Sequence, residues 1–96
     1  MQEALGIVET IGLATAVQAA DAAVKTANVK ITSHNRIGGG KVSVFIRGDV
    51  AAVKAAVDAA IASASQIGKV TSTTVIPRPS EKLSPIFPID IVKREQ

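Results

Sequence analysis

The chain has 96 residues, which fits one small domain, and 47% of them are hydrophobic. It contains no cysteine, which excludes a disulfide framework, a thiolate metal site and a cysteine nucleophile. The net charge is +3, but of the basic residues only Lys93 and Arg94 are adjacent, and the only aromatic residues are two phenylalanines. Because nucleic-acid surfaces need clustered positive charge or aromatic platforms, we expect no nucleic-acid partner.

The composition also argues against a secreted or membrane protein. The first ten residues, MQEALGIVET, lack the basic segment and long apolar run of a secretory signal. Lys54 and Asp58 interrupt the most Ala/Val-rich segment, so no apolar run reaches the roughly 18 residues of a membrane span. We therefore expect a cytoplasmic protein with no membrane partner.

The apolar content is dominated by small side chains. Sixteen of the residues are alanine, and each buries little area, whereas hydrophobic stabilisation scales at roughly 25 cal/mol per Å². An isolated copy should be marginally stable. The composition therefore predicts either very close helix packing or stabilisation by neighbouring copies.

The first half of the chain predicts a strand, a helix and a hairpin. Residues 4–10 alternate with period two, as a strand does. From Gly12 the apolar positions recur at steps of three and four, which predicts an amphipathic helix with an Asp21–Lys25 pair and a core-facing stripe of Leu13, Val17, Ala20, Val24 and Ala27. Residues 28–36 and 41–47 alternate again and flank a glycine-rich loop, with Val42, Val44 and Ile46 on one face.

The second half repeats the pattern of helix and strand. Asp49 is suited to cap a second helix, and Gly68 stands where a left-handed residue would end it. The predicted apolar stripe is Val50, Val53, Val57, Ala60, Ile61, Ala64 and Ile67. Residues 70–76 predict a fourth strand, and a proline-punctuated tail follows.

The order β-α-β-β-α-β predicts an α+β, ferredoxin-like fold. A four-stranded antiparallel sheet should carry both helices on one face, with a short C-terminal tail beyond it. This topology does not by itself identify a function.

The residues give no positive case for catalysis or for a metal. His34 is the only imidazole, and its position on a predicted strand favours a surface or edge histidine. The carboxylates show no local pairing of the kind used in acid–base chemistry. We therefore expect no enzyme, no metal and no cofactor.

The segment Gly38-Gly39-Gly40-Lys41 resembles a phosphate-binding loop only superficially. Such a loop needs Ser or Thr where Val42 stands and a helix after it, whereas a strand is predicted here. The simplest interpretation is a tight hairpin, for which two glycines would suffice. A third glycine removes every side chain from the loop tip, which matters if something must pass close by.

Arg78 lies between Pro77 and Pro79, and the two prolines favour an extended, stiff backbone. The arginine is either an ordinary surface residue at a strand end or an interface residue, since its rigid fork suits partner contacts. Lys25 by itself is read as a solvated charge near the end of a helix.

Several short motifs follow one another in a fixed order and spacing over some 75 residues: EALGIVET (3–10), GL (12–13), ADAAVK (20–25), ANV (27–29), IGGG (37–40), RGDVAAVKAA (47–56) and VIPRP (75–79). Through this joint order and spacing the chain as a whole resembles the single-domain, hexamer-forming shell proteins of bacterial microcompartments. This resemblance implies a structural shell protein of the metabolosome type, with a shell domain over residues 4–88 and a tail over residues 89–96.

The resemblance also implies roles for individual residues. In that family six subunits form a hexagonal tile around a central pore, and tiles join edge to edge. Ile37, Gly38, Gly39 and Gly40 match the pore loop, with Gly39 at the constriction, where many relatives have serine. The tile-edge residues are matched by Lys25, Asn28 and Arg78.

Further expectations concern charge and partners. We expect Arg36 and Lys41 to add positive potential at the pore mouth, and small polar metabolites to cross the pore. The implied partners are five further copies in a homohexamer, other shell proteins and targeting peptides of cargo enzymes. We expect the tail to pack on its own tile; the alternative is that Ile86, Phe87, Ile89 and Ile91 help form a hydrophobic groove for such peptides. The alternative function is a ferredoxin-like regulatory protein that binds a small molecule.

Overall fold

The structure is a computed structural model, which describes residues 3–83. Its elements follow the predicted order: β1 (Ala4–Ile11), α1 (Leu13–Thr26), β2 (Lys30–Gly38), β3 (Lys41–Gly48), α2 (Val50–Ala64), β4 (Lys69–Ile76) and the 3₁₀ turn η1 (Glu81–Leu83). Within the described residues, neither helix has the length and apolar content needed to cross a bilayer.

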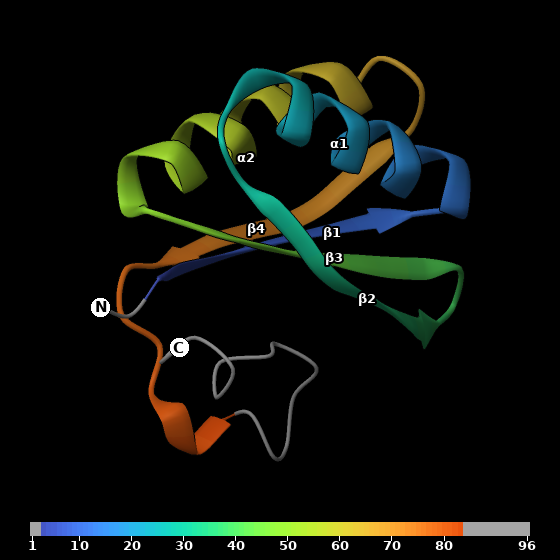
Figure 1. The fold of residues 1–96 in the computed structure, drawn as a ribbon. Helices are drawn as coiled ribbons and strands as arrows, with labels where there is room; N and C mark the ends of the chain where they lie inside the picture. The colour runs from blue at the N-terminus through green and yellow to red at the C-terminus, as the bar shows by residue number, and fades with distance from the viewer. Residues whose placement is uncertain (1–2, 84–96) are drawn as a thin grey trace.

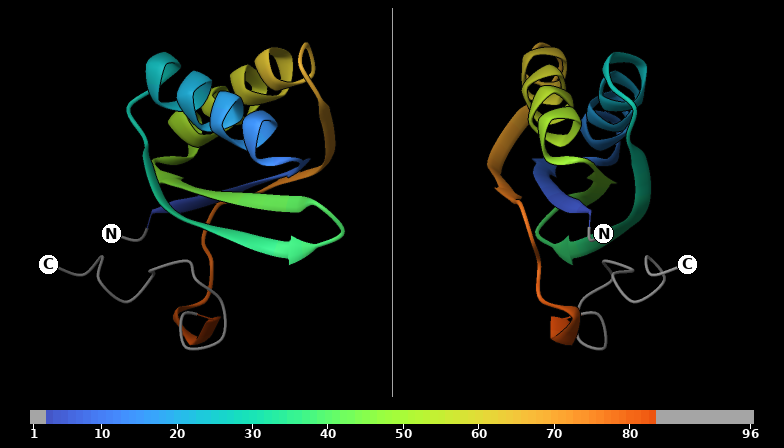
Figure 2. Two further views of the ribbon diagram at one scale, coloured as in Figure 1. Left: turned by 90° about the vertical axis from the view of Figure 1, so that its right-hand side faces the viewer. Right: turned by 60° about the vertical axis from the view of Figure 1, so that its left-hand side comes forward.

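The four strands form one antiparallel sheet in the order β2-β3-β1-β4. Both helices cover one face of the sheet, and η1 lies beyond the other face (Figures 1 and 2). Helix α1 lies on the side of β2, and α2 on the side of β4 (Figure 2, right). The predicted α+β architecture is therefore confirmed.

Small residues allow the helices to lie close to the sheet. A Cβ placed on Gly6 of β1 would come within 2.8 Å of Val53 Cγ1 and 2.9 Å of Val57 Cγ2, so α2 packs almost directly on the strand backbone. The α2 residues buried there are Val53, Ala56, Val57, Ala60 and Ala64. The predicted close packing of alanine-rich helices is observed.

The predicted core-facing stripe of α1 is correct for Ala20 and Ala27, which pack against the core, and wrong for its larger members. The residues that it buries are the small ones Thr15, Ala16, Ala19 and Ala23. The larger residues Leu13, Val17 and Val24 are exposed, by 47%, 59% and 45%. Helix α1 therefore packs on the sheet through small side chains, and the bulky part of its apolar stripe is turned outward.

Asp49 and Gly68, the residues predicted to begin and end α2, do not have the predicted roles. Asp49 is the N-cap residue, but its side chain makes no capping hydrogen bond. The helix ends at Ala64, and Ile67 beyond it is 57% exposed rather than part of the core. Gly68 does not have a positive φ. Position 68 requires a residue without a side chain, because a Cβ at Gly68 would lie 2.0 Å from Thr15 Oγ1.

A bulge in β2 changes which of its side chains face the helices. The pairing of β2 with β3 shifts between Ile31 and Ser33, so that His34 pairs with Val44. Val44 belongs to the core beneath the helices. The strict alternation predicted from Val29 and Ile31 would have put Ser33 on that face.

The sheet face away from the helices carries a second, smaller apolar cluster. Leu5 and Phe45 are buried there, with Leu83 of η1 packed against them. Arg47 on the same face is fully buried, and it donates hydrogen bonds from Nε to Ala4 O (3.0 Å) and from Nη2 to Glu3 O (2.9 Å). The predicted tail, with its apolar residues Ile86, Phe87, Ile89 and Ile91, lies outside the described residues.

The contact between Gly68 and Thr15 gives a stability test. We expect Gly68→Ala to lower the free energy of unfolding by about 1–3 kcal/mol, because overpacking costs about that much. The double variant Thr15→Ala/Gly68→Ala should lose less than the sum of the two single changes, since it removes the clashing Oγ1 and Cγ2 atoms. Denaturant unfolding of the four proteins measures this coupling. Strict additivity would contradict the close-approach explanation.

Candidate functional site: the glycine loop and the opposite edge

The glycine loop forms one end of the sheet. Gly38 pairs with Lys41, which leaves Gly39 and Gly40 as the two-residue tip of a hairpin. All three glycines have positive φ, of 94°, 63° and 77° along the chain. Two positive φ values at the tip are typical of a type I′ turn. The expectation that two glycines would suffice is therefore wrong, because Gly38 also adopts the left-handed backbone beside a register shift.

The space around Gly38 and Gly39 is empty of neighbouring atoms. A Cβ built on Gly38 or on Gly39 would meet nothing within 4 Å. The base of the loop, in contrast, is held in place, because Gly12 N donates a 2.7 Å hydrogen bond to Gly40 O. The hairpin therefore presents bare backbone at a fixed position next to the start of α1.

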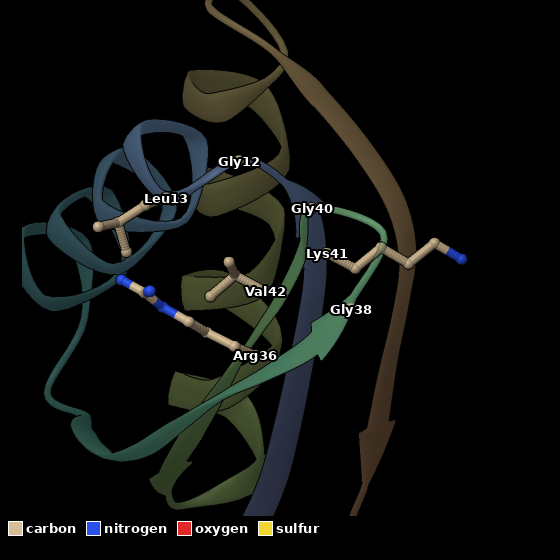
Figure 3. Close-up of a pocket in the computed structure, with 7 residues that line it drawn as sticks. All are labelled: Gly12, Leu13, Arg36, Gly38, Gly40, Lys41 and Val42. Carbon is tan, nitrogen blue, oxygen red and sulfur yellow. The ribbon is translucent and has the colours of Figure 1, made fainter.

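A cavity of about 320 Å³ lies beside this loop (Figure 3). Its lining comes from the β1–α1 junction, the end of β2 and the start of β3, namely Gly12, Leu13, Arg36, Gly38, Gly40, Lys41 and Val42. Sequence reasoning missed Gly12 and Leu13 here. The one sequence signal for these residues is that Gly12 immediately precedes a predicted helix. Only the fold shows that this glycine lies against the hairpin.

The two positive charges near the loop lie on opposite faces of the sheet. Arg36 points toward Leu13 on the helix side, whereas Lys41 points the other way, past β4 (Figure 3). The strand register also places the two side chains on opposite faces. Arg36 pairs with the core residue Val42, whereas Lys41 pairs with Ile11 on the other face. The two side chains therefore do not form one cluster.

The three predicted edge residues lie at the end of the sheet away from the glycine loop. Ala4 pairs with Gly48, and the neighbouring Leu5 pairs with Ile76, so β1 starts where β3 and β4 end. A Cβ on Gly48 would lie 3.2 Å from the backbone oxygen of Asn28. Arg78 follows Ile76 by two residues. The register thus brings Asn28 and Arg78 to the same end, with Lys25 in the last turn of α1.

All three edge side chains are accessible. Lys25, Asn28 and Arg78 are exposed, while Pro79 next to Arg78 is buried and anchors the backbone. Lys25 Nζ lies 2.9 Å from Asp21 Oδ2, which confirms the predicted pair. The Lys25 side chain remains 73% exposed, so this contact holds it only weakly.

The remaining candidate for chemistry is isolated. His34 is exposed on β2, which is an edge strand, as the surface interpretation predicts. Within residues 3–83 no group of three or more histidine and acidic side chains is close enough to hold a metal ion.

The fold and these two ends can be compared with known proteins. Residues 4–79 match the family model described as the BMC domain. The chain belongs to this family. It is 54% identical over 87 residues to the bacterial microcompartment shell protein PduA of Citrobacter freundii, covering 91% of this chain and 94% of PduA. The match to the shell protein EutM of Escherichia coli K12 is 51% over 89 residues, covering 93% and 92% of the two chains.

The relatives also distinguish among shell types. The carboxysome shell protein CcmK2 of Thermosynechococcus vestitus is 45% identical, covering 93% of this chain and 89% of CcmK2. The similarity is greater to PduA and EutM, which agrees with the predicted metabolosome type. These homologues confirm a structural shell protein and count against the alternative of a small-molecule regulator.

A solved structure supports the fold. The crystal structure of a microcompartment protein from Desulfitobacterium hafniense DCB matches with a TM-score of 0.78 and 41% identity, covering 88% of this BMC-domain chain. The present chain spans 48% of the length of that protein.

The backbone angle at Gly39 predicts which substitutions the loop tolerates. At a φ of 63° with open space around it, Gly39→Asn should change stability little, because asparagine visits the left-handed region readily. Gly39→Val should lower the free energy of unfolding by about 1–2 kcal/mol, the usual cost of this region for other residues. Denaturant titration of both variants checks the difference. Equal stability of the two would contradict the left-handed assignment.

Proposed function

We propose that six copies of this chain form a flat hexagonal tile of a metabolosome shell, with the glycine loops around a central pore and Lys25, Asn28 and Arg78 at the outer edge. The observation that carries this proposal is the separation of the glycine loop from the three edge residues. The side-chain-free loop lies at one end of the sheet, and the exposed edge residues lie at the other. Native mass spectrometry tests the hexamer directly.

The loop suits a pore for small polar or anionic metabolites. Six loops of bare glycine around an axis would leave a comparatively wide opening, lined by backbone N–H groups that can donate to such solutes. Ile37, which is 50% exposed, precedes the glycines at the rim of this opening. Because Arg36 and Lys41 point to opposite faces of the sheet, each would add a ring of positive charge to a different mouth. Net attraction of anions is then expected from both sides.

The outer edge suits contact between tiles. Arg78 is exposed next to a buried proline, so its guanidinium group is presented on a fixed stalk. Lys25 can lay its methylene chain along a neighbouring tile while the ammonium group reaches backbone oxygens, which is how long basic side chains cover apolar surface. The exposed Asp21 contact offers little resistance to this rearrangement.

Partners beyond the hexamer follow from the same role. Other shell proteins of the compartment would share the tile edges, and targeting peptides of cargo enzymes would bind a tile face. The predicted peptide groove, with Ile86, Phe87, Ile89 and Ile91, lies outside the described residues. Truncation after Pro88, which removes Ile89 and Ile91, followed by cargo pull-down tests the tail. Retained cargo binding would exclude residues 89–96 as the binding element.

The pore assignment predicts the effect of a bulky side chain at the loop tip. Gly39→Leu should leave hexamers and sheets intact, because the added side chain points into open space. Metabolite flux into intact shells should fall several-fold, since six leucines would fill the opening. Gly39→Ala is the matched control, with the same backbone cost and a much smaller obstruction. Unaltered flux through intact Gly39→Leu shells would rule out the pore.

The edge assignment predicts a separation of hexamer formation from sheet formation. Lys25→Ala and Arg78→Ala should each give soluble hexamers that form no extended sheets in electron microscopy. Lys54→Ala is the control, because Lys54 is an exposed lysine on α2 and not at the predicted edge. Normal sheets from either edge variant would refute the role of that residue.

A further inference from the structure

The sheet face away from the helices carries two lysines near the glycine loop, and the proposed function uses only one of them. Lys41 of β3 pairs with Ile11 of β1, and Ile11 pairs on its other side with Lys69 of β4. Residues that pair directly across a sheet point to the same face. Val70, the next residue of β4, packs against the core beneath the helices, so Lys69 points to the opposite face. Lys41 and Lys69, the lysine pair, therefore flank Ile11 on one surface.

The lysine pair lies next to the backbone of the loop. A Cβ on Gly40 would lie 3.9 Å from Ile11 Cγ2, so the residue between the two lysines borders the loop itself. The strands that carry the lysines are two interstrand spacings apart, which is about 10 Å. Lysine side chains are long and flexible, so two ammonium groups at this separation can reach one bound anion from either side.

Both charges of the lysine pair are available to a ligand. Lys41 and Lys69 are exposed, and among the described residues neither forms an ion pair with a carboxylate. The acidic residue of β1 is Glu9, and its Oε1 accepts a 2.7 Å hydrogen bond from Thr71 Oγ1. Ile11, which is 41% exposed, places no competing charge between the two ammonium groups. The surface beside the loop is therefore a positive patch without a bound counter-charge.

The helix side of the same end of the sheet carries less charge. Arg36 points toward Leu13 on that side, whereas Lys41 points away from it (Figure 3). In the proposed hexamer, each copy would bring the lysine pair to one pore mouth and Arg36 to the other. Like charges around a ring reinforce one another's potential, so the lysine mouth should attract anions more strongly, and multiply charged anions most of all.

We propose that the lysine pair binds linked phosphate groups, so that one face of the tile is a docking site for anions that carry a di- or triphosphate. This inference rests on the proposed function, because an isolated exposed pair holds such an ion only weakly, whereas six pairs act together around one mouth. It adds Lys69 to the pore mouth and names a class of ligand. The ammonium group of lysine binds phosphate as a point charge, and linked phosphates engage several such charges at once.

Calorimetric titration of inorganic tripolyphosphate into the full-length hexamer at low salt tests the site. The parent protein should bind tripolyphosphate about tenfold more tightly than inorganic phosphate, because several ammonium groups act together. Lys41→Gln and Lys69→Gln should each weaken binding by about fivefold, since each removes one exposed charge contact from every subunit. A nucleoside triphosphate in a parallel titration should match tripolyphosphate if the phosphate chain alone is recognised, and exceed it if the organic part also contacts the surface.

Lys30→Gln is the matched control for these variants. Lys30 is an exposed lysine that pairs with Arg47 on the same face, at the opposite end of the sheet. Its replacement removes the same charge from every subunit and should leave the dissociation constant unchanged.

Native mass spectrometry of the parent and the variants separates this site from the proposed function. A hexameric parent that does not bind tripolyphosphate, or whose binding weakens equally in all three variants, would overturn the lysine site and leave the hexamer standing. A parent protein that is not hexameric would overturn the proposed function, and the ring of lysines with it.

Discussion

The close approach of two helices to the sheet is the constraint on which the rest of this structure depends. At Gly6 the side chains of α2 come within 3 Å of the place where a Cβ would stand, and at Gly68 the chain passes equally close to Thr15 of α1. Glycine is required at these two positions, and most of the residues that the helices bury are alanine. The alanine-rich composition is therefore a packing requirement of a thin subunit.

The thin core determines where the larger apolar residues lie. Leu13, Val17 and Val24 lie on the exposed side of α1, and Ile67 lies beyond the end of α2. A chain that buries many alanines gains little area from each of them, so burial between subunits would add stability. Stability of the subunit and assembly into a tile would then be two consequences of one packing geometry.

The two ends of the sheet carry different candidate functional residues. One end carries a hairpin with three left-handed glycines and no side chain at its tip, held by the hydrogen bond between Gly12 and Gly40. The other end gathers exposed polar and basic residues around the start of β1. Antiparallel register produces this division, because it aligns strand ends that are distant in the sequence.

The sequence by itself determined the order of the elements, the family and the candidate residues, since hydrophobic periodicity and motif spacing are local properties. It could not determine which side of α1 faces the core, because helical periodicity counts alanine and valine alike. It also could not place His34 and Arg36 on the helix face, because that depends on a bulge in the pairing of β2 with β3. The tertiary structure alone decided these orientations, since each depends on contacts between segments far apart in the chain.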